Sequence, residues 1–444
     1  MGRKSHRRAL NLWMNGALVG EWAIASGGGS ELSYAPEWLA SEAHRPLSLS
    51  LPINFDGLPL RGEVVSNYFE NLLPDSDKIR RRLQQRFGTA SQEAFDLLTA
   101  IGRDCVGAVQ LLPIGDTPAG PHPLPSQLEP LDEAGIARCL RQAVGGHSMP
   151  GLQDDPGDFR ISIAGAQEKT ALTHYKGRWH RPAGVTPTTH IFKLPLGLVG
   201  NLQVDMSDSV ENEWLCGQIL AGFGLAVAKS EIAQFEDQRA LVVERFDRVW
   251  SEARGFWLRL PQEDMCQARG LPPLMKYEND GGPGIVNIAT LLRASVTPEQ
   301  DVECFLKAQL IMWLLAATDG HAKNFSIRLM PGGRFQLTPL YDVLSAWPVI
   351  GHGSKLLPIE KVRMAMAQEG RNRHYRLREI QRRHFNATAQ RCGLAAGRFD
   401  AVIDDVIANV HSVIDAVATQ LPEDFPGWVF ERVAHGMRDA AQRL

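Results

Sequence analysis

Two carboxylates and one amide in the C-terminal half constrain the fold of this chain more than any other feature. Asp319 and Asn324 lie five positions apart in the segment TDGHAKN, and Asp342 follows a short hairpin-like stretch. A loop of this length can turn an Asp and an Asn toward one cavity. The layout is typical of a kinase catalytic centre, where one carboxylate orients a substrate hydroxyl while the amide and the other carboxylate hold Mg²⁺ ions on the phosphates of ATP. Because Asp and Asn are also ordinary loop residues, the pattern alone is equally compatible with a loop that has no catalytic role.

The length and charge of the chain set broad limits on its organisation. At 444 residues it exceeds what one hydrophobic core supports, so two lobes or domains are expected. The net charge of −3 gives no general attraction to nucleic acid, so any such contact needs a local patch. The six cysteines form no Cys-x-x-Cys pair, which indicates reduced, buried thiols and neither a disulfide framework nor a zinc site.

The sequence contains no evident export or membrane signal. The first eight residues are basic, but the segment after them alternates and never becomes a continuous apolar run. The most apolar helical stretch, residues 308–317, has about half the length that a bilayer requires. We therefore expect a soluble, cytoplasmic protein without membrane contact.

Alternating apolar residues predict a β-rich first half. Residues 9–25 are expected to form a hairpin that turns at Asn15-Gly16, a pair that favours tight hairpin turns. The other elements expected in this part are strands at 46–52 and 105–112 and a helix at 65–85. Six prolines and two glycines between residues 113 and 130 predict a loop boundary.

Strands dominate residues 159–250, and the pattern after about residue 255 is mainly helical. The expected strands are 159–163, 170–175, 190–194 and 239–246, with a helix at 208–223 that Gly224 ends. The expected helices of the last part are 284–293, 299–317, 376–392 and 398–420, with a hairpin at 325–338. This is an α+β plan with two lobes. We divide it into an N-terminal β-rich subdomain (1–130), the core of the first lobe (131–250) and a helical lobe (251–444).

A loop of small residues between two predicted strands is a candidate phosphate-binding loop. It comprises Ala164, Gly165, Ala166, Gln167, Glu168 and Lys169. Small side chains let backbone N–H groups approach phosphate oxygens closely. One glycine is a weak signal, and a tight hairpin that needs a small residue is an equally good interpretation.

Lys193 lies among apolar residues of the predicted strand that follows this loop. It resembles the strand lysine with which kinases hold the α- and β-phosphates of ATP, although an exposed strand face is the alternative. Glu211 and Glu213 on the next helix could each pair with its ammonium group, and we favour Glu213. Carboxylates at a helix N-terminus are also favoured by the helix dipole alone.

Residues 241–248, LVVERFDR, join the β-rich and helical halves where a kinase hinge would lie. The backbone at Glu244 and Phe246 could therefore hydrogen-bond adenine. None of these motifs is decisive alone. The loop, lysine, helix glutamate, hinge, Asp-x4-Asn and second Asp nevertheless follow one another in the order found in protein and lipid kinases.

With these residues in place, the chain resembles the HipA family of serine/threonine kinase toxins from bacterial toxin–antitoxin pairs over nearly its whole length. The segments that carry the resemblance are YAPEWLA (34–40), NLLPDS (71–76), IGRD (101–104), AGAQEKTA (164–171), LPQEDMCQ (260–267), residues 277–284 and the string around Asp319. The resemblance implies a two-lobed protein-kinase-like fold with an extra N-terminal subdomain. It also implies ATP and Mg²⁺ as ligands.

The resemblance further implies roles for single residues. Asp319 would be the catalytic base, with Asn324 and Asp342 as Mg²⁺ ligands. Lys193 and residues 164–169 would hold the phosphates, Glu244 and Phe246 the adenine, and Gln262 and His321 would line the nucleotide pocket. Ser162, which strand alternation alone would turn outward, matches the serine that such toxins autophosphorylate. A phosphate adds about −1.5 to −2 charges, so it would expel the loop and switch the kinase off.

The resemblance finally implies partners and a cellular role. Family members are neutralised by a small helix-turn-helix antitoxin, here a HipB-like one, and the pair represses its own operon. Their kind of substrate is an aminoacyl-tRNA synthetase, whose inactivation halts translation and promotes persistence. Arg378, Arg382 and Arg383 belong to an arginine-rich segment (371–384) whose counterpart in the family approaches operator DNA, with a solvated helix face as the alternative. Two other functions stay open: a small-molecule phosphotransferase with the same Asp/Asn/Asp centre, and a non-catalytic, antitoxin-binding corepressor.

Overall fold

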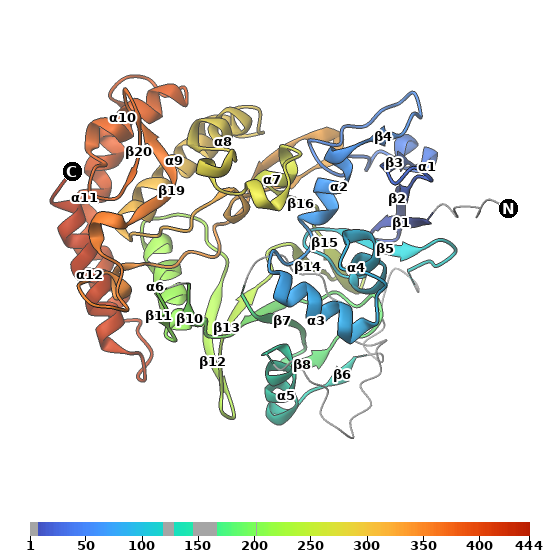
Figure 1. Ribbon diagram of the computed structural model, residues 1–444, viewed down its shortest axis with the longest axis horizontal. Helices are drawn as coiled ribbons and strands as arrows, with labels where there is room; N and C mark the ends of the chain where they lie inside the picture. The colour runs from blue at the N-terminus through green and yellow to red at the C-terminus, as the bar shows by residue number, and fades with distance from the viewer. Residues whose placement is uncertain (1–7, 119–127, 145–166, 201) are drawn as a thin grey trace.

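The computed structural model of the protein describes residues 8–118, 128–144, 167–200 and 202–444. The predicted strand at 159–163, the proposed phosphoserine Ser162 and the loop residues Ala164, Gly165 and Ala166 lie outside the described residues. Figure 1 shows the N-terminal sheet and the C-terminal helices at opposite sides of the molecule, with the second large sheet below and between them.

The N-terminal part is a five-stranded antiparallel sheet covered by short helices. Its strand order is β4-β3-β2-β1-β5. The predicted hairpin is confirmed as β1 and β2, which turn at Asn15 and Gly16, both with positive φ as such a turn requires. The strands are β1 (Arg8–Met14), β2 (Ala17–Ile24), β3 (Ser30–Tyr34), β4 (Leu60–Arg61) and β5 (Val109–Pro113), and the helices are α1 (Pro36–Ala40), α2 (Glu63–Glu70), α3 (Asp77–Phe87) and α4 (Ala94–Ile101).

Three expectations for this part are wrong in detail. The single helix predicted at 65–85 is two helices, α2 and α3, because Pro74 interrupts the chain and the Ser76 side chain caps α3. The strand predicted at 46–52 is a tight turn, in which Ser48 donates its hydroxyl to the carbonyl of Gln267 at 3.1 Å. The strand predicted from residue 105 begins only at Val109, after Gly107 with φ +75°.

The second sheet has six strands in the order β12-β13-β9-β7-β8-β6. The strands expected at 170–175, 190–194 and 239–246 and the helix at 208–223 are confirmed, and Gly224 follows the helix with φ +80°. The strands are β6 (Glu129–Pro130), β7 (Lys169–Tyr175), β8 (Arg178–Arg181), β9 (His190–Lys193), β12 (Ser230–Phe235) and β13 (Gln238–Glu244). Helix α5 (Glu133–Val144) packs on this sheet through Ile136 and Leu140, which share a core with Phe192. Helix α6 (Ser209–Gly222) follows the small hairpin β10 (Gly197–Val199) and β11 (Val204–Met206).

The last part is mainly helical. Its helices are α7 (Met265–Ala268), α8 (Ile285–Leu292), α9 (Pro298–Leu314), α10 (Arg382–Arg391), α11 (Arg398–Ala418) and α12 (Gly427–Ala441). The hairpin expected at 325–338 is confirmed as β17 (Ser326–Leu329) and β18 (Phe335–Leu337), which β16 (Gln262–Asp264) extends to three strands. A small hairpin, β14 (Arg248–Ser251) and β15 (Phe256–Arg259), connects the second sheet to this part.

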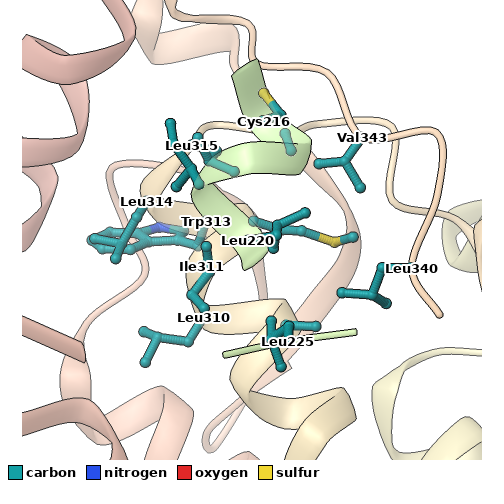
Figure 2. Close-up of a cluster of buried hydrophobic side chains, with 14 of the residues drawn as sticks. Cys216, Leu220, Leu225, Leu310, Ile311, Trp313, Leu314, Leu315, Leu340 and Val343 are labelled. Carbon is teal, nitrogen blue, oxygen red and sulfur yellow. The ribbon is translucent and has the colours of Figure 1, made fainter. Parts of the chain in front are cut away.

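Helix α6 belongs to the core of the helical part although it follows the second sheet in the sequence. In Figure 2, Cys216 and Leu220 of α6 gather in one cluster with Ile311 and Leu315, which come from α9 and its end. These side chains are 1% exposed or less. The helix that carries Glu211 and Glu213 is therefore fixed to the helical lobe by apolar packing.

One expectation for the helical part is wrong, and one helix was not predicted. The helix predicted at 376–392 begins only at Arg382, because residues Arg373–Arg376 form strand β20, which pairs with the unpredicted strand β19 (Arg363–Glu369). The helix that was not predicted is α12, in which Val429, Val433 and Met437 are fully buried at helical spacing. That spacing is the signal by which the helix could have been found.

The cysteines agree with the expectation of buried thiols. All six cysteines are free thiols, and all except the half-buried Cys304 are buried. Within the described ranges, no helix combines the length and the apolar character that a bilayer-spanning segment needs.

Candidate active site

A cavity of about 250 Å³ lies between the second sheet and the helical part. Its walls include strands β9 and β13, helix α6 and the segment that follows α9. Many of the site residues predicted from the sequence line this one cavity. They are Gln167, Lys169, Lys193, Glu244, Phe246, Gln262, Asp319, His321, Asn324 and Asp342.

Lys193 is the charged centre of the cavity. Its ammonium group donates to Glu213 Oε1 at 2.6 Å and to Asp342 Oδ1 at 2.7 Å. The choice of Glu213 over Glu211 is confirmed, because Glu211 accepts instead from Arg239. Burial alone would lower the pKa of Lys193, but the carboxylates of Asp342 and Glu213 outweigh it and raise that pKa above its ordinary value. The lysine is therefore a fixed cation.

Asp342 links Lys193 to the Asp-x4-Asn loop. Its other oxygen, Oδ2, accepts from Asn324 Nδ2 at 3.1 Å. Burial would raise the pKa of Asp342, but Lys193 and then Lys169 hold it well below its usual range, so the carboxylate is ionised. The backbone of Asp342 has φ +60°, a left-handed conformation that few non-glycine residues adopt. Strained positions of this kind are concentrated at functional sites.

Asp319 lies at the exposed rim of the cavity. Its Oδ1 accepts from the hydroxyl of Tyr277 at 2.6 Å, and its backbone carbonyl accepts from the N–H of His321 at 2.8 Å. The Tyr277 ring meets the His321 ring edge-on, with 4.9 Å between the ring centres. Tyr277 thus holds the carboxylate in place, and a hydroxyl group from outside could take its position.

Three buried polar atoms of residues that line the cavity lack a partner among the described residues. These are Nδ1 of His321, Oε1 of Gln262 and Oδ1 of Asn71. Burial lowers the pKa of His321, which favours the neutral ring. Because unpaired buried polar atoms are costly, three of them in one cavity indicate a polar ligand there.

Lys169 brings a second lysine into the cavity. It lies directly opposite Lys193 in the pairing of β7 with β9. Burial, and then repulsion from Lys193, lowers the pKa of Lys169 to about 8. Its neighbours contact the protein itself: Gln167 Nε2 donates to the carbonyl of Leu194 at 2.6 Å, and Glu168 pairs with Arg82 of α3, away from the cavity lining.

The predicted hinge residues belong to the cavity wall. The N–H of Glu244 donates to the carbonyl of Lys229 at 2.8 Å, and its side chain is exposed. The ring centre of Phe246 lies 5.9 Å from that of Tyr341. Both residues therefore border the cavity between the sheet and the helical part.

A buried ionic cluster lies behind the hinge and joins it to the N-terminal part. We call Asp104, Asp247, Arg245, Arg248 and Arg259 the hinge cluster. Oδ1 of Asp104 accepts from Arg248 and Arg259, both at 2.9 Å, and its Oδ2 accepts from Arg245 at 3.3 Å. Every member is at most 5% exposed. The predicted hinge segment is therefore bonded to a carboxylate from the N-terminal part through Arg245 and Arg248.

The oxygen donors of the cavity fit a magnesium ion. Asp342 and Asn324 offer carboxylate and amide oxygens, the ligand type that Mg²⁺ prefers. In the described part of the chain, no group of three or more His, Cys, Asp or Glu side chains is arranged to hold a metal. A site with few protein ligands suits Mg²⁺, which usually completes its shell with water and substrate phosphates.

Sequence reasoning missed Tyr277, Asp75, Lys276 and Lys323. Oδ1 of Asp75 accepts from Lys323 at 2.6 Å and its Oδ2 accepts from Lys276 at 2.9 Å. All four residues fall within or beside the segments quoted for the family resemblance. Their spacing along the chain, however, gives no sign that they meet.

The arginine-rich segment lies outside the cavity lining. Arg378 pairs with Glu360 at 3.2 Å, and Arg382 pairs with Asp400 at 2.8 Å and with Asp404 at 2.7 Å. Nε of Arg383 donates to the ring of His384 at 3.2 Å. These arginines therefore already have partners on the protein surface.

Comparisons with known proteins show the family to which this chain is related. The family model described as HipA N-terminal domain matches residues 10–112, and the one described as HipA-like C-terminal domain matches residues 161–414. The Sinorhizobium fredii protein Y4mE, which is named as a putative kinase, is 37% identical over 340 residues, covering 76% of this chain and 77% of its own. The serine/threonine-protein kinase toxin HipA of Shewanella oneidensis is 27% identical over 352 residues, covering 76% of this chain and 75% of its own.

A solved structure has the same fold over almost the whole length. It is Shewanella oneidensis HipA in a complex with HipB and its operator DNA, and the match has a TM-score of 0.76 at 23% identity. The match covers 98% of this chain and 97% of that one. The predicted fold class, a two-lobed, kinase-like α+β fold with an extra N-terminal subdomain, is thereby confirmed.

Proposed function

Since this chain belongs to the HipA family, we propose that it is an ATP- and Mg²⁺-dependent protein serine/threonine kinase that acts as the toxin of a toxin–antitoxin pair. The observation that carries the proposal is the contact of Lys193 with both Glu213 and Asp342, beside Asn324 and Asp319, in one cavity. Kinases need a lysine fixed by a helix glutamate and a carboxylate for the metal at the same point.

Each residue of the chain has a definite task in this mechanism. Lys193 holds negative charge of the phosphates, and Asp342 and Asn324 supply oxygen ligands for the metal. Asp319 accepts a hydrogen bond from the substrate hydroxyl in place of Tyr277, orients the oxygen and takes up its proton. Bound Mg–ATP supplies the phosphoryl group and partial neutralisation of its charge.

The nucleotide is expected to meet residues that have spare hydrogen-bonding capacity. We propose that the backbone at Glu244 and Phe246 holds the adenine and that Gln262 and His321 contact the nucleotide with the atoms that lack partners among the described residues. The loop of residues 164–169 completes the phosphate site. Only Gln167, Glu168 and Lys169 of this loop are described, so its role depends on the family resemblance.

The family membership extends the proposal to substrate and partners. We propose an aminoacyl-tRNA synthetase as the protein substrate, whose phosphorylation halts translation and promotes persistence. A HipB-like antitoxin would bind the kinase in the cytoplasm, and the complex would repress its own operon. Autophosphorylation at Ser162 would switch the kinase off, because the added charge stands next to a loop that binds phosphate.

The test is incubation of purified protein with Mg²⁺ and labelled ATP in a whole-cell lysate. Label on a protein band supports a protein kinase, and label on metabolites alone supports a small-molecule phosphotransferase. Absence of any transfer, with antitoxin binding intact, would favour a non-catalytic corepressor. Intact mass after incubation reports autophosphorylation, and Ser162→Ala should remove the added phosphate without removing transfer to other proteins.

Nucleotide affinity should fall as the pH rises above 8. The pKa of Lys169 is lowered to about 8, so this lysine is charged at pH 7 and mostly neutral at pH 9.5. A neutral amine no longer attracts phosphate, and each pH unit above 8 should lower the affinity for Mg–ATP up to about tenfold. Calorimetric titration between pH 7 and 9.5 measures this. Lys169→Met should bind weakly and equally across this range, whereas a pH slope equal to that of the wild type would exclude Lys169 as the cause.

The arginine-rich segment can be tested through the salt dependence of DNA binding. We propose that Arg378 and Arg382 exchange their surface ion pairs, and Arg383 its hydrogen bond to His384, for operator phosphates, because surface ion pairs contribute little stability. Alanine at all three positions should weaken operator affinity of the antitoxin complex. The slope of log affinity against log salt should flatten by about 0.9 for each phosphate that the variant no longer neutralises. Arg398→Ala is the control, since this exposed arginine pairs with Glu303 on another helix. An unchanged slope would indicate that the segment is a solvated surface that does not contact operator DNA.

A further inference from the structure

Asp75 joins the N-terminal part to the catalytic loop. It lies between α2 and α3, and its two oxygens accept from Lys323 at 2.6 Å and from Lys276 at 2.9 Å. Lys323 stands in the loop between Asp319 and Asn324, and Lys276 immediately precedes Tyr277. One carboxylate therefore connects two lysines that flank the proposed base and its hydrogen-bond partner.

The two lysine-bearing segments form one unit around Asp319. The N–H of Ala322 donates to the carbonyl of Lys276 at 3.1 Å, and Tyr277 donates to Asp319 at 2.6 Å. A displacement of either lysine would therefore move the loop that holds Asp319. Asp75, Lys276, Lys323 and Asp319 all line the same cavity.

Hydrogen bonds from neighbouring residues hold the segment of Asp75 in place. Asn71 Nδ2 donates to the carbonyl of Leu271 and Asn67 Nδ2 to that of Gly270, both at 2.8 Å. These bonds attach the end of α2 to the turn after α7. The Asp75 side chain is only 14% exposed and that of Lys323 only 5%, so water screens their charges weakly. Without the carboxylate, two ammonium groups would be left close together and would repel each other.

We propose that Asp75 is a positioning residue for phosphoryl transfer. Through Lys323 it fixes the loop between Asp319 and Asn324, and through Lys276 it fixes the segment of Tyr277. This role rests on the proposed kinase function. It assigns to the N-terminal part a share in the geometry of the active site, although the residues proposed to contact the nucleotide all follow residue 160 in the sequence.

The test replaces Asp75 by asparagine, which keeps the shape and removes the charge. Phosphate release from Mg–ATP and self-phosphorylation are both measured. We expect kcat to fall at least tenfold while KM for ATP changes less than twofold, because Asp75 bonds to Lys276 and Lys323, whereas Lys193 is held by Glu213 and Asp342. Asp75→Glu should recover part of the rate, since it restores a carboxylate.

A double-mutant cycle with Lys323→Met distinguishes positioning from general stability. If Asp75 acts through Lys323, the double variant should be no slower than the slower single variant. Glu70→Gln is the matched control: it breaks the ion pair with Arg80 at 2.6 Å in the same segment and should leave kcat unchanged. Thermal unfolding of each variant verifies that it is folded.

Three results would overturn the role of Asp75. They are a kcat within twofold of wild type for Asp75→Asn, an effect confined to KM, and losses that multiply in the double variant. The proposed function fails separately, if wild-type protein releases phosphate but labels no protein. In that case Asp75 is still judged by phosphate release. If the wild-type protein does neither, both proposals fall.

Discussion

Replacement of Asp319 by asparagine should lower phosphoryl transfer about 10²–10⁴-fold, the usual contribution of a positioned general base. The amide has the same shape but cannot take up the hydroxyl proton. Nucleotide affinity should stay close to that of the wild type, because the Lys193, Glu213 and Asp342 contacts do not include Asp319. Transfer of labelled phosphate and calorimetric titration with Mg–ATP measure the two quantities. Expression of the variant should no longer inhibit growth.

The control for Asp319 is another carboxylate at the same side of the molecule. Asp280 is exposed and lies three residues after Tyr277, and Asp280→Asn should transfer phosphate at the wild-type rate. Growth inhibition or phosphate transfer by Asp319→Asn at the wild-type level would refute Asp319 as the base. Loss of antitoxin binding in that variant would instead indicate a folding defect.

Replacement of Asp104 by alanine should destabilise the fold by about 3–5 kcal/mol, the cost of removing one partner from a buried ion pair. The carboxylate is 2% exposed and accepts from three arginines, which would be left without it in the interior. Urea unfolding at pH 7 measures the free energy of unfolding. Asp116→Asn is the matched control, because its pair with Arg103 is long, 3.8 Å, and half-exposed, and such surface pairs contribute at most about 1 kcal/mol.

The loss of stability in Asp104→Ala should depend on pH. Burial would raise the pKa of Asp104, but Arg248, Arg259 and Arg245 outweigh it and hold that pKa well below its usual range. A carboxyl group whose folded pKa is depressed stabilises the fold fully above its unfolded pKa of about 4, and loses this contribution as the pH falls toward the folded value. The difference in the free energy of unfolding between the wild type and Asp104→Ala should therefore become smaller below pH 4. A difference that is constant from pH 7 to pH 3 would contradict this account.

Local signals in the sequence were enough for much of the fold. The Asn15-Gly16 turn defines its hairpin because both residues tolerate positive φ, and Gly224 marks the end of α6 for the same reason. The secondary-structure predictions fail where contacts between residues far apart in the sequence determine the local structure. The helix predicted from residue 376 begins only at Arg382, and Arg376 is instead the last residue of strand β20, which pairs with β19. Leu47 and Leu51 alternate like strand residues, yet a serine bonded to Gln267 bends them into a turn.

Some residues of the candidate site could likewise be predicted from local motifs, whereas others depend on contacts in the folded chain. The Asp-x4-Asn loop, Asp342 and Lys193 lie in compact motifs whose chemistry can be read from their neighbours. The pairing of Lys193 with Glu213 and not Glu211 depends on how α6 is rotated, and the structure resolves it. Asp75 could not be predicted, because 201 positions separate it from Lys276 and only the folded chain brings them together.

The anchoring of α6 limits how this enzyme can be regulated. In many two-lobed kinases, the inactive form arises when the helix that carries the glutamate rotates outward and its ion pair with the lysine is lost. Here Cys216, Leu215 and Leu220 bury that helix in the apolar interior of the opposite lobe, so an outward swing would expose a large oily surface to water. We therefore expect compounds that fill the cavity beside Lys193 to be a better starting point for inhibitors than compounds that require a displaced helix.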